Sequence, residues 1–170
     1  MTLIVCPLRF VETLVSTRRP SHLITLLAPE EMIGTPSGVA IDRHLRLGVH
    51  DIAEPIEGLT HPNDTLIERL LDFARQWDES APLLIHCWAG ISRSTAAAFA
   101  IACERSPRAD EFEIARRLRG ASSTAYPNRR IVALADDILD RRGRMLAAVE
   151  AIGGNTFAIE GKPFELAARH

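Results

Sequence analysis

A run of six residues near the middle of the chain, PLLIHC from Pro82 to Cys87, limits the possible folds more than any other stretch. It is too short for a helix and lacks the polar alternation of a strand with one wet face, so it predicts a strand covered on both faces. An alanine-rich segment from Ser94 to Glu104 follows, and alanine favours a helix that packs closely on a sheet. A buried strand that leads through a tight loop into such a helix is typical of parallel α/β proteins.

The rest of the chain alternates short apolar runs with segments of helical spacing. After Asp64, for example, apolar side chains recur at the intervals of an amphipathic helix. Strands are expected at residues 2–8, 23–27, 45–50 and 82–87, and helices at 10–17, 64–79, 94–104, 110–119 and 127–152. This order predicts an α/β three-layer sandwich with a small, mainly parallel central sheet of about four to five strands flanked by helices.

The length of 170 residues, 46% of them hydrophobic, suits one sizeable core. We therefore expect a single domain over residues 1–170, with its core at about residues 2–150 and a C-terminal extension at 151–170. The structure of this extension is open, although Phe157, Ile159, Phe164 and Leu166 suggest that it packs against some other part of the protein or a partner.

Charge and hydropathy narrow the classes of partner. Twenty basic against twenty-two acidic residues give a net charge of -2, which argues against nucleic acid or an anionic membrane as the main partner. The sequence has no apolar stretch near the roughly 20 residues of a membrane span and no secretory signal at its start, so a cytoplasmic protein is expected. Nineteen of the twenty basic residues are arginine, a bias typical of a GC-rich bacterial genome.

Cysteine and histidine give no sign of a disulfide framework or a metal site. The three cysteines, Cys6, Cys87 and Cys103, are odd in number and scattered. The histidines show no metal-ligand spacing, so neither a metal nor another cofactor is expected. Cys103 is interpreted as core filler.

The chemistry is expected in HCWAGISRST, residues 86–95, between the buried strand and the alanine-rich helix. A loop wound round one point directs several backbone N–H groups at an anion, and the helix N-terminus adds partial positive charge. The same field stabilises a thiolate at Cys87. Arg93 supplies a planar fork that bonds two phosphate oxygens at once, and Ser94 can offer its hydroxyl to the sulfur.

The segment HCWAGISRS resembles the active-site signature of the dual-specificity branch of the protein tyrosine phosphatases. The resemblance implies that family's fold and a two-step mechanism through a cysteinyl-phosphate. It makes Cys87 the nucleophile, gives Ser94 a part in breakdown of the intermediate, and lets His86 support the loop and the thiolate. The residues that it assigns to phosphate binding are Trp88, Ala89, Gly90, Ile91, Ser92 and Arg93.

A general acid is expected from the same resemblance, on a loop after an earlier strand. Asp51 stands 36 residues before Cys87 and follows the strand predicted at 45–50, and functional loops gather at the carboxyl ends of parallel strands. Glu54 and Glu57 share its loop and are possible substitutes. Asn128, in Tyr126-Pro127-Asn128, matches an asparagine that lies near the active site in dual-specificity phosphatases.

Several alternatives stay open at this level. The substrate is expected to be a phosphorylated protein or, alternatively, a small phosphomonoester such as an inositol phosphate, a lipid headgroup or a nucleotide. A phosphate-binding module without catalysis and a rhodanese-type sulfur transferase are the other classes. Cys87 and His86 could also be ordinary core residues, and Trp88 either shapes the pocket rim or packs under the loop. Arg141, Arg142 and Arg144 are expected at a solvated helix end.

Overall fold

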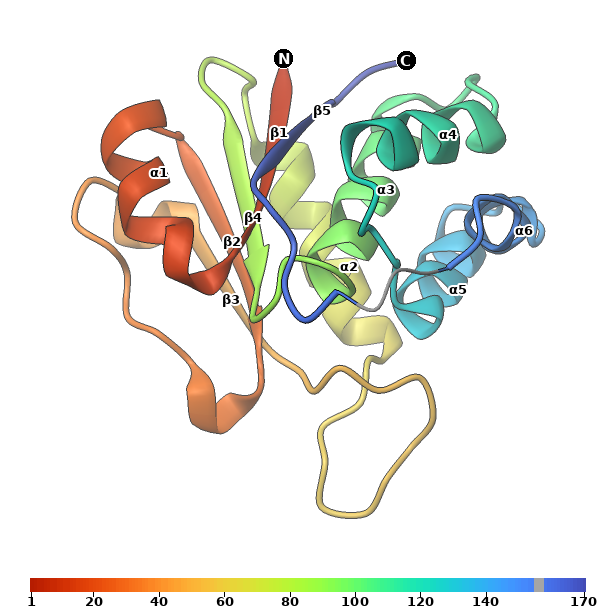
Figure 1. The fold of residues 1–170 in the computed structure, drawn as a ribbon, viewed down its shortest axis with the longest axis horizontal. Coiled ribbons are helices and arrows are strands. Elements are labelled where there is room, and N and C mark those ends of the chain that lie inside the picture. Colours follow the sequence, from red (N-terminus) through yellow and green to blue (C-terminus); the bar gives the residue numbers. More distant parts are fainter. Residues whose placement is uncertain (155–157) are drawn as a thin grey trace.

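The computed structural model describes residues 1–154 and 158–170, and a five-stranded sheet lies at its centre (Figure 1). The strand order is β3-β2-β4-β1-β5, with the last strand antiparallel to β1 and the other neighbours parallel. The strands are β1 (Thr2–Pro7), β2 (His22–Leu27), β3 (His44–Gly48), β4 (Leu83–Cys87) and β5 (Phe164–Ala167). The predicted α/β sandwich with a small, mainly parallel sheet is therefore confirmed.

Strand β4 is central, and every one of its residues is buried, as its continuous apolar run predicted. It pairs with β1 on one side, where Pro7 is opposite Cys87, and with β2 on the other, where Thr25 is opposite His86. Parallel pairing brings the carboxyl ends of β1, β2, β3 and β4 to one edge, which is the lower edge in Figure 1. Both termini of the chain lie at the opposite edge.

The two faces of the sheet are covered unequally (Figure 1). Helix α1 packs on one face through Val11 and Val15. The other face carries the larger core, in which every residue from Ala96 to Cys103 is buried. The helices are α1 (Val11–Arg18), α2 (Asp64–Gln76), α3 (Arg93–Arg105), α4 (Glu111–Ala121), α5 (Arg129–Ile138) and α6 (Arg144–Ala151). Short 3-10 turns occur at Leu8–Phe10, Pro29–Glu31 and Ile41–Arg43.

The single long helix expected at 127–152 is wrong, because two helices, α5 and α6, occupy this stretch. The chain turns between them at Asp140, Arg142 and Gly143, all of which have positive φ. The buried carboxylate of Asp136 accepts hydrogen bonds from Gly143 N, at 2.5 Å, and from Met145 N, at 2.6 Å, and so caps the second helix.

The same turn changes the place of Arg141, which was expected at a solvated helix end. Its side chain is only 6% exposed and pairs with the equally buried Glu111 at 2.9 Å, while Nη2 donates to Cys103 O at 2.6 Å. Breaking the helix is what allows this arginine to turn inward and join α4 to the end of α3. A cluster of arginines in the sequence gave no means of telling the buried one from its neighbours.

The C-terminal residues add the antiparallel edge strand β5, in which Phe164 and Leu166 are buried and face the larger core. The packing expected of these two side chains is observed, whereas Ile159 is 95% exposed. Phe157 lies outside the described residues. Across residues 1–154 and 158–170, none of the helices combines the length and the apolar character needed to cross a membrane.

Candidate active site

The site begins where β4 ends at Cys87, whose side chain is 1% exposed. The chain then curls through Trp88–Ser92 into the first turn of α3. Gly90 has φ +67, and a Cβ at this position would lie 2.6 Å from Pro7 N and 2.8 Å from the carbonyl carbon of Cys6. Only glycine fits both the conformation and the close approach to β1, so the loop can wind tightly.

The carbonyls on the first half of this loop are bound from outside it. Trp88 O accepts a hydrogen bond from Leu8 N at 3.1 Å, and Ala89 O accepts one from Gly161 N at 2.8 Å. The C=O and N–H of a trans peptide point in opposite directions. The N–H groups of Ala89 and Gly90, which share peptides with these carbonyls, therefore face the inside of the loop.

The second half of the loop follows the same rule. Ile91 O accepts from Tyr126 N at 2.9 Å, and Ser92 O accepts from Asn128 N at 3.2 Å. The N–H groups of Ser92 and Arg93 consequently point inward, beside the N-terminus of α3, where further helix N–H groups are unpaired within the helix. Hydrogen-bond donors and the positive end of a helix dipole thus surround one point, an arrangement that binds an anion.

Arg93 lies against this point with a side chain that is 6% exposed. Its Nη1 donates to Val49 O at 2.7 Å, which fixes the guanidinium against the end of β3. Its Nε is also buried, and among residues 1–154 and 158–170 it has no hydrogen-bond partner. Buried donors are rarely left unpaired, because desolvation without a hydrogen bond costs about 1–3 kcal/mol. An unpaired guanidinium donor next to converging amides indicates a site built for an oxyanion.

The sulfur of Cys87 lies 3.1 Å from Oγ of Ser94, and the serine is wholly buried. Ser94 is the second residue of α3, so its position is set by the helix and not by a flexible loop. A hydroxyl this close can donate to a thiolate, which makes the sulfur a better leaving group.

Asp51 lies over the loop, although the strand before it ends at Gly48 and not at His50 as predicted. Its Oδ1 accepts from Ser92 Oγ at 2.7 Å and from Asn128 Nδ2 at 2.9 Å. Its Oδ2 is 4.0 Å from Arg93 Nε, and 39% of the side chain is exposed. Asp51 therefore contacts the loop from Trp88 to Arg93, here named the anion cradle, which also holds Cys87 at its base.

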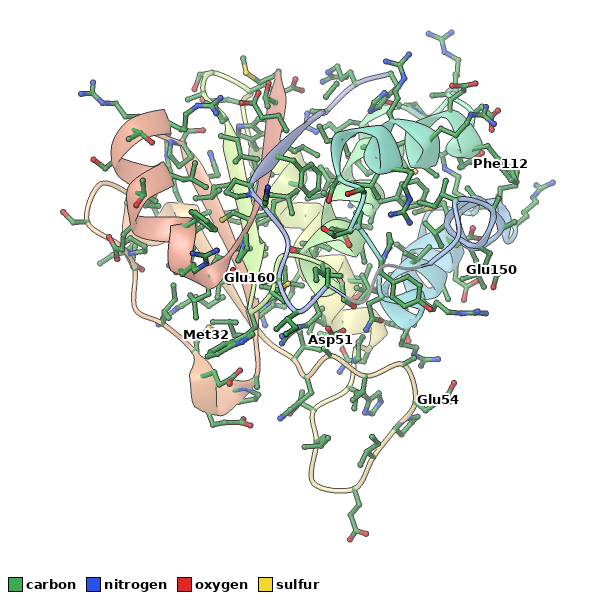
Figure 2. The ribbon with its side chains drawn as sticks, in the orientation of Figure 1. Met32, Asp51, Glu54, Phe112, Glu150 and Glu160 are labelled. Atoms are coloured by element: carbon green, nitrogen blue, oxygen red, sulfur yellow. The ribbon has the colours of Figure 1, made fainter. Side chains whose placement is uncertain are left out.

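The two possible substitutes for Asp51 lie elsewhere on its loop. Figure 2 shows Asp51 close to the lower edge of the sheet and Glu54 farther out on the projecting part of the loop. Glu57 lies farther along and is exposed. Of the three carboxylates, the structure brings only Asp51 into contact with the loop from Trp88 to Ser92.

Asn128 has two tasks that fix the orientation of its amide. Its Oδ1 accepts from the N–H groups of Arg130 and Ile131, each at 3.1 Å, as the N-cap of α5. Its Nδ2 must then face the other way, where it donates to Asp51. The helix cap and the position of the carboxylate are thus coupled through one side chain.

Behind the loop, His86 belongs to a chain of buried hydrogen bonds. Its Nδ1 is 3.4 Å from the carbonyl oxygen of Cys87, which can only accept, so Nδ1 carries the hydrogen. Nε2 then accepts from Thr25 Oγ1 at 2.7 Å, and that hydroxyl accepts from His44 Nε2 at 2.8 Å. The chain ends where Thr35 Oγ1 donates to His44 Nδ1 at 3.0 Å. His86 is held neutral in one tautomer.

Burial lowers the pKa of His86 from 6.5 to about 4, and it lowers the pKa of His44 to a similar value. Both rings are therefore neutral near pH 7, as the hydrogen-bond chain requires. The sequence reasoning did not identify Thr25 and His44 as partners of His86. An isolated threonine in the apolar strand HLITLL was the available signal, since a buried hydroxyl needs a partner.

The tryptophan of the loop and the two other cysteines contribute no reactive group to the site. Trp88 is 54% exposed, so its side chain lies at the rim and does not pack under the loop. Cys6 and Cys103 are buried free thiols, and burial raises the pKa of each to about 12, which makes them inert. In the part of the chain that the structure describes, no group of three or more histidine, cysteine or acidic side chains could hold a metal ion.

Comparison with protein-family models and with curated protein sequences finds no match. Comparison with solved structures does. The chain is similar to DUSP15, with a TM-score of 0.60 and 17% identity over 89% of this chain and 92% of that chain. It is similar to human DUSP28, with a TM-score of 0.60 and 17% identity over 82% and 92% of the two chains. It is also similar to PTPMT1 in complex with PI(5)P, with a TM-score of 0.58 and 16% identity over 88% and 91%. The fold of this chain is therefore that of the dual-specificity and protein tyrosine phosphatases.

Proposed function

We propose that the chain is a cysteine-dependent phosphomonoester hydrolase of the protein-tyrosine or dual-specificity type. The observation that supports this most directly is the buried Nε of Arg93, which has no hydrogen-bond partner within residues 1–154 and 158–170 and lies next to a ring of inward N–H groups with Cys87 at its base. This set of donors matches the three equatorial oxygens of a phosphoryl group in transit, and it needs no metal or other cofactor.

In the first step of the proposed reaction, the Cys87 thiolate attacks phosphorus and the bond from phosphorus to the substrate oxygen breaks. Arg93 and the loop amides hold the three other oxygens throughout. The departing oxygen takes its proton from Asp51, which lies over the loop between Ser92 and Asn128. The products of this step are the dephosphorylated alcohol and a cysteinyl-phosphate.

In the second step, water attacks the phosphorus of the cysteinyl-phosphate and Asp51, now a carboxylate, accepts a proton from that water. The bond from phosphorus to sulfur breaks, and Ser94, at 3.1 Å, donates a hydrogen bond to the departing sulfur. Inorganic phosphate leaves, and the thiolate and the protonated acid are restored. His86 acts only by holding the Cys87 peptide.

The substrate is proposed to be a phosphorylated protein. The loop residues from Trp88 to Ser92 carry no cationic side chain that would neutralise additional phosphates. The alternative of an inositol phosphate or lipid headgroup is supported by the likeness to PTPMT1, which was solved with PI(5)P. Comparing kcat/KM for phosphopeptides, phosphoinositides and nucleotides decides between them. A cytoplasmic location is part of the same proposal, because free thiols suit a reducing compartment.

The experiment that tests this proposal replaces the two central residues. We expect Cys87→Ser to abolish hydrolysis of an aryl phosphate while the folded protein still binds tungstate, because the amides and Arg93 remain. Arg93→Lys should also lose most of kcat, since a point charge cannot replace the fork. Cys103→Ala and the exposed Arg108→Lys are the matched controls and should stay active. Near-normal turnover in Cys87→Ser would overturn the assignment.

A further inference from the structure

The C-terminal residues lie against the candidate active site. Ile159–Pro163, here named the C-terminal strap, lead into β5 and pass beside the loop that follows β4 (Figure 1). The strap is anchored at its far end, because Phe164 and Leu166 are buried and Ala168 N donates to Met1 O at 2.9 Å. The chain cannot leave the site without giving up this edge strand.

One hydrogen bond joins the strap to the anion cradle. Gly161 is buried, and its N–H donates to Ala89 O at 2.8 Å. This bond holds the peptide between Ala89 and Gly90 so that the N–H of Gly90 faces the inside of the loop. Leu8 N holds the preceding peptide in the same way, at 3.1 Å from Trp88 O.

The contact at Gly161 is a close approach of two backbones. A Cβ on Gly161 would lie 3.2 Å from Gly90 O, 3.2 Å from Thr124 Oγ1 and 3.5 Å from Ala89 O. A carbonyl oxygen of the loop cannot rotate aside as the end of a side chain can. A side chain at this position must therefore move the strap or the loop by a few tenths of an ångström.

The two segments that hold the loop are also joined to each other. Glu160, beside Gly161, pairs with Arg9, which follows Leu8, at 2.6 Å. Figure 2 places Glu160 near the edge of the sheet where β1 and β4 end. The pair is largely exposed and adds little stability, but it aligns Gly161 with Leu8 on one side of the loop.

We propose that the C-terminal strap is a positioning element of the active site, with Gly161 as its positioning residue. The strap presets the orientation of the Gly90 N–H for the phosphate, which raises anion affinity and, to a greater extent, stabilises the transition state. The inference rests on the proposed function for its effect on turnover, whereas its effect on anion binding can be measured without turnover.

The first test compares Gly161→Ala with two controls. Gly34→Ala adds a Cβ with nothing within 4 Å, and Lys162→Ala changes an exposed neighbour in the strap. For Gly161→Ala we expect the Kd for tungstate to rise by roughly tenfold or more, the usual worth of a hydrogen bond to a charged group. KM for an aryl phosphate should rise and kcat should fall, with both controls unchanged. Wild-type tungstate affinity in a folded Gly161→Ala protein would overturn the proposal.

The second test needs no variant and decides the matter if Gly161→Ala fails to fold. Coupling between two sites is reciprocal, so an anion that is favoured by the strap must in turn stabilise the strap. Tungstate should slow hydrogen exchange at the Gly161 amide of the wild-type protein. If exchange slows at the loop amides but not at Gly161, the strap has no positioning role. Absence of wild-type turnover would remove the proposed enzyme, and the tungstate measurements would still decide on the strap.

Discussion

Acid should destabilise this protein earlier than protonation of its carboxylates alone would predict, because His86 is buried as a neutral ring. Its pKa falls from 6.5 in the unfolded chain to about 4 in the folded protein. Between these values the unfolded chain binds a proton that the folded protein does not. The free energy of unfolding therefore rises with pH through this window and falls as the pH is lowered.

The size of the effect follows from the two pKa values. Each pKa unit corresponds to about 1.36 kcal/mol, so the difference reaches about 3 kcal/mol when the ring is fully titrated. At about pH 5 only part of it is lost, and we expect His86 alone to reduce the free energy of unfolding by about 2 kcal/mol relative to about pH 7. His44 is shifted in the same direction by burial and adds to the loss. This is a large share of the roughly 5–15 kcal/mol that stabilises a typical domain.

Urea unfolding at a series of pH values between about 5 and 7 measures this slope. His86→Gln removes the titrating ring, so that variant should show a shallower slope. It should also be less stable near neutral pH, because the Thr25 hydroxyl loses the ring nitrogen that accepts its hydrogen bond. Thr25→Ser keeps the hydroxyl and should keep the wild-type slope. A wild-type free energy that stays constant over this range, or an unchanged slope in His86→Gln, would show that the ring is not buried as a neutral acceptor.

Three further predictions follow from contacts at the site and beneath it. Asp51→Asn should remove the alkaline limb of the pH profile of kcat/KM and lower kcat roughly 10²–10⁴-fold for phosphotyrosine. The loss should be smaller for an aryl phosphate with a good leaving group, and equal losses on both substrates would move the acid to Glu54 or Glu57. Asn128→Asp keeps the helix cap but replaces the amide that donates to Asp51 at 2.9 Å by a second carboxylate. The alkaline limb should therefore move to higher pH, and an unmoved limb would contradict the coupling between Asn128 and Asp51. Glu111→Gln leaves the buried charge of Arg141 unpaired and should lower the free energy of unfolding, measured with urea, by about 3–5 kcal/mol. A loss under about 1 kcal/mol would refute a buried ion pair.

Local patterns predicted the architecture well because the segments that carry it are self-consistent. The run PLLIHC indicated a buried strand and the alanine-rich segment favoured a close-packed helix, and β4 and α3 lie where they were expected. The helix from Asp64 ends at Gln76, slightly earlier than predicted, after starting at the expected residue. The failure at residues 127–152 has a tertiary cause. The turn between α5 and α6 is stabilised by Asp136 and by the burial of Arg141 against Glu111, and neither contact leaves a trace in local periodicity.

The sequence by itself determined which residue types stand in the loop after β4 and in what order, since Cys87, Gly90, Arg93 and Ser94 are neighbours along the chain. Their chemistry depends on spacing within one strand, loop and helix, and local conformation is enough to gather them. Asp51 was indicated by the resemblance to the dual-specificity phosphatases, and the shared edge of parallel strands explained how it could lie near Cys87.

Only the tertiary structure decided which distant groups orient these residues. The loop carbonyls are bound by Leu8, Gly161, Tyr126 and Asn128, which come from three separate parts of the chain. All four donate to these carbonyls through backbone N–H groups, and every residue except proline has such a group, so the side-chain pattern cannot mark them. The orientation of the cradle is therefore a property of the folded chain, because it arises where backbones meet and not from which side chains they carry.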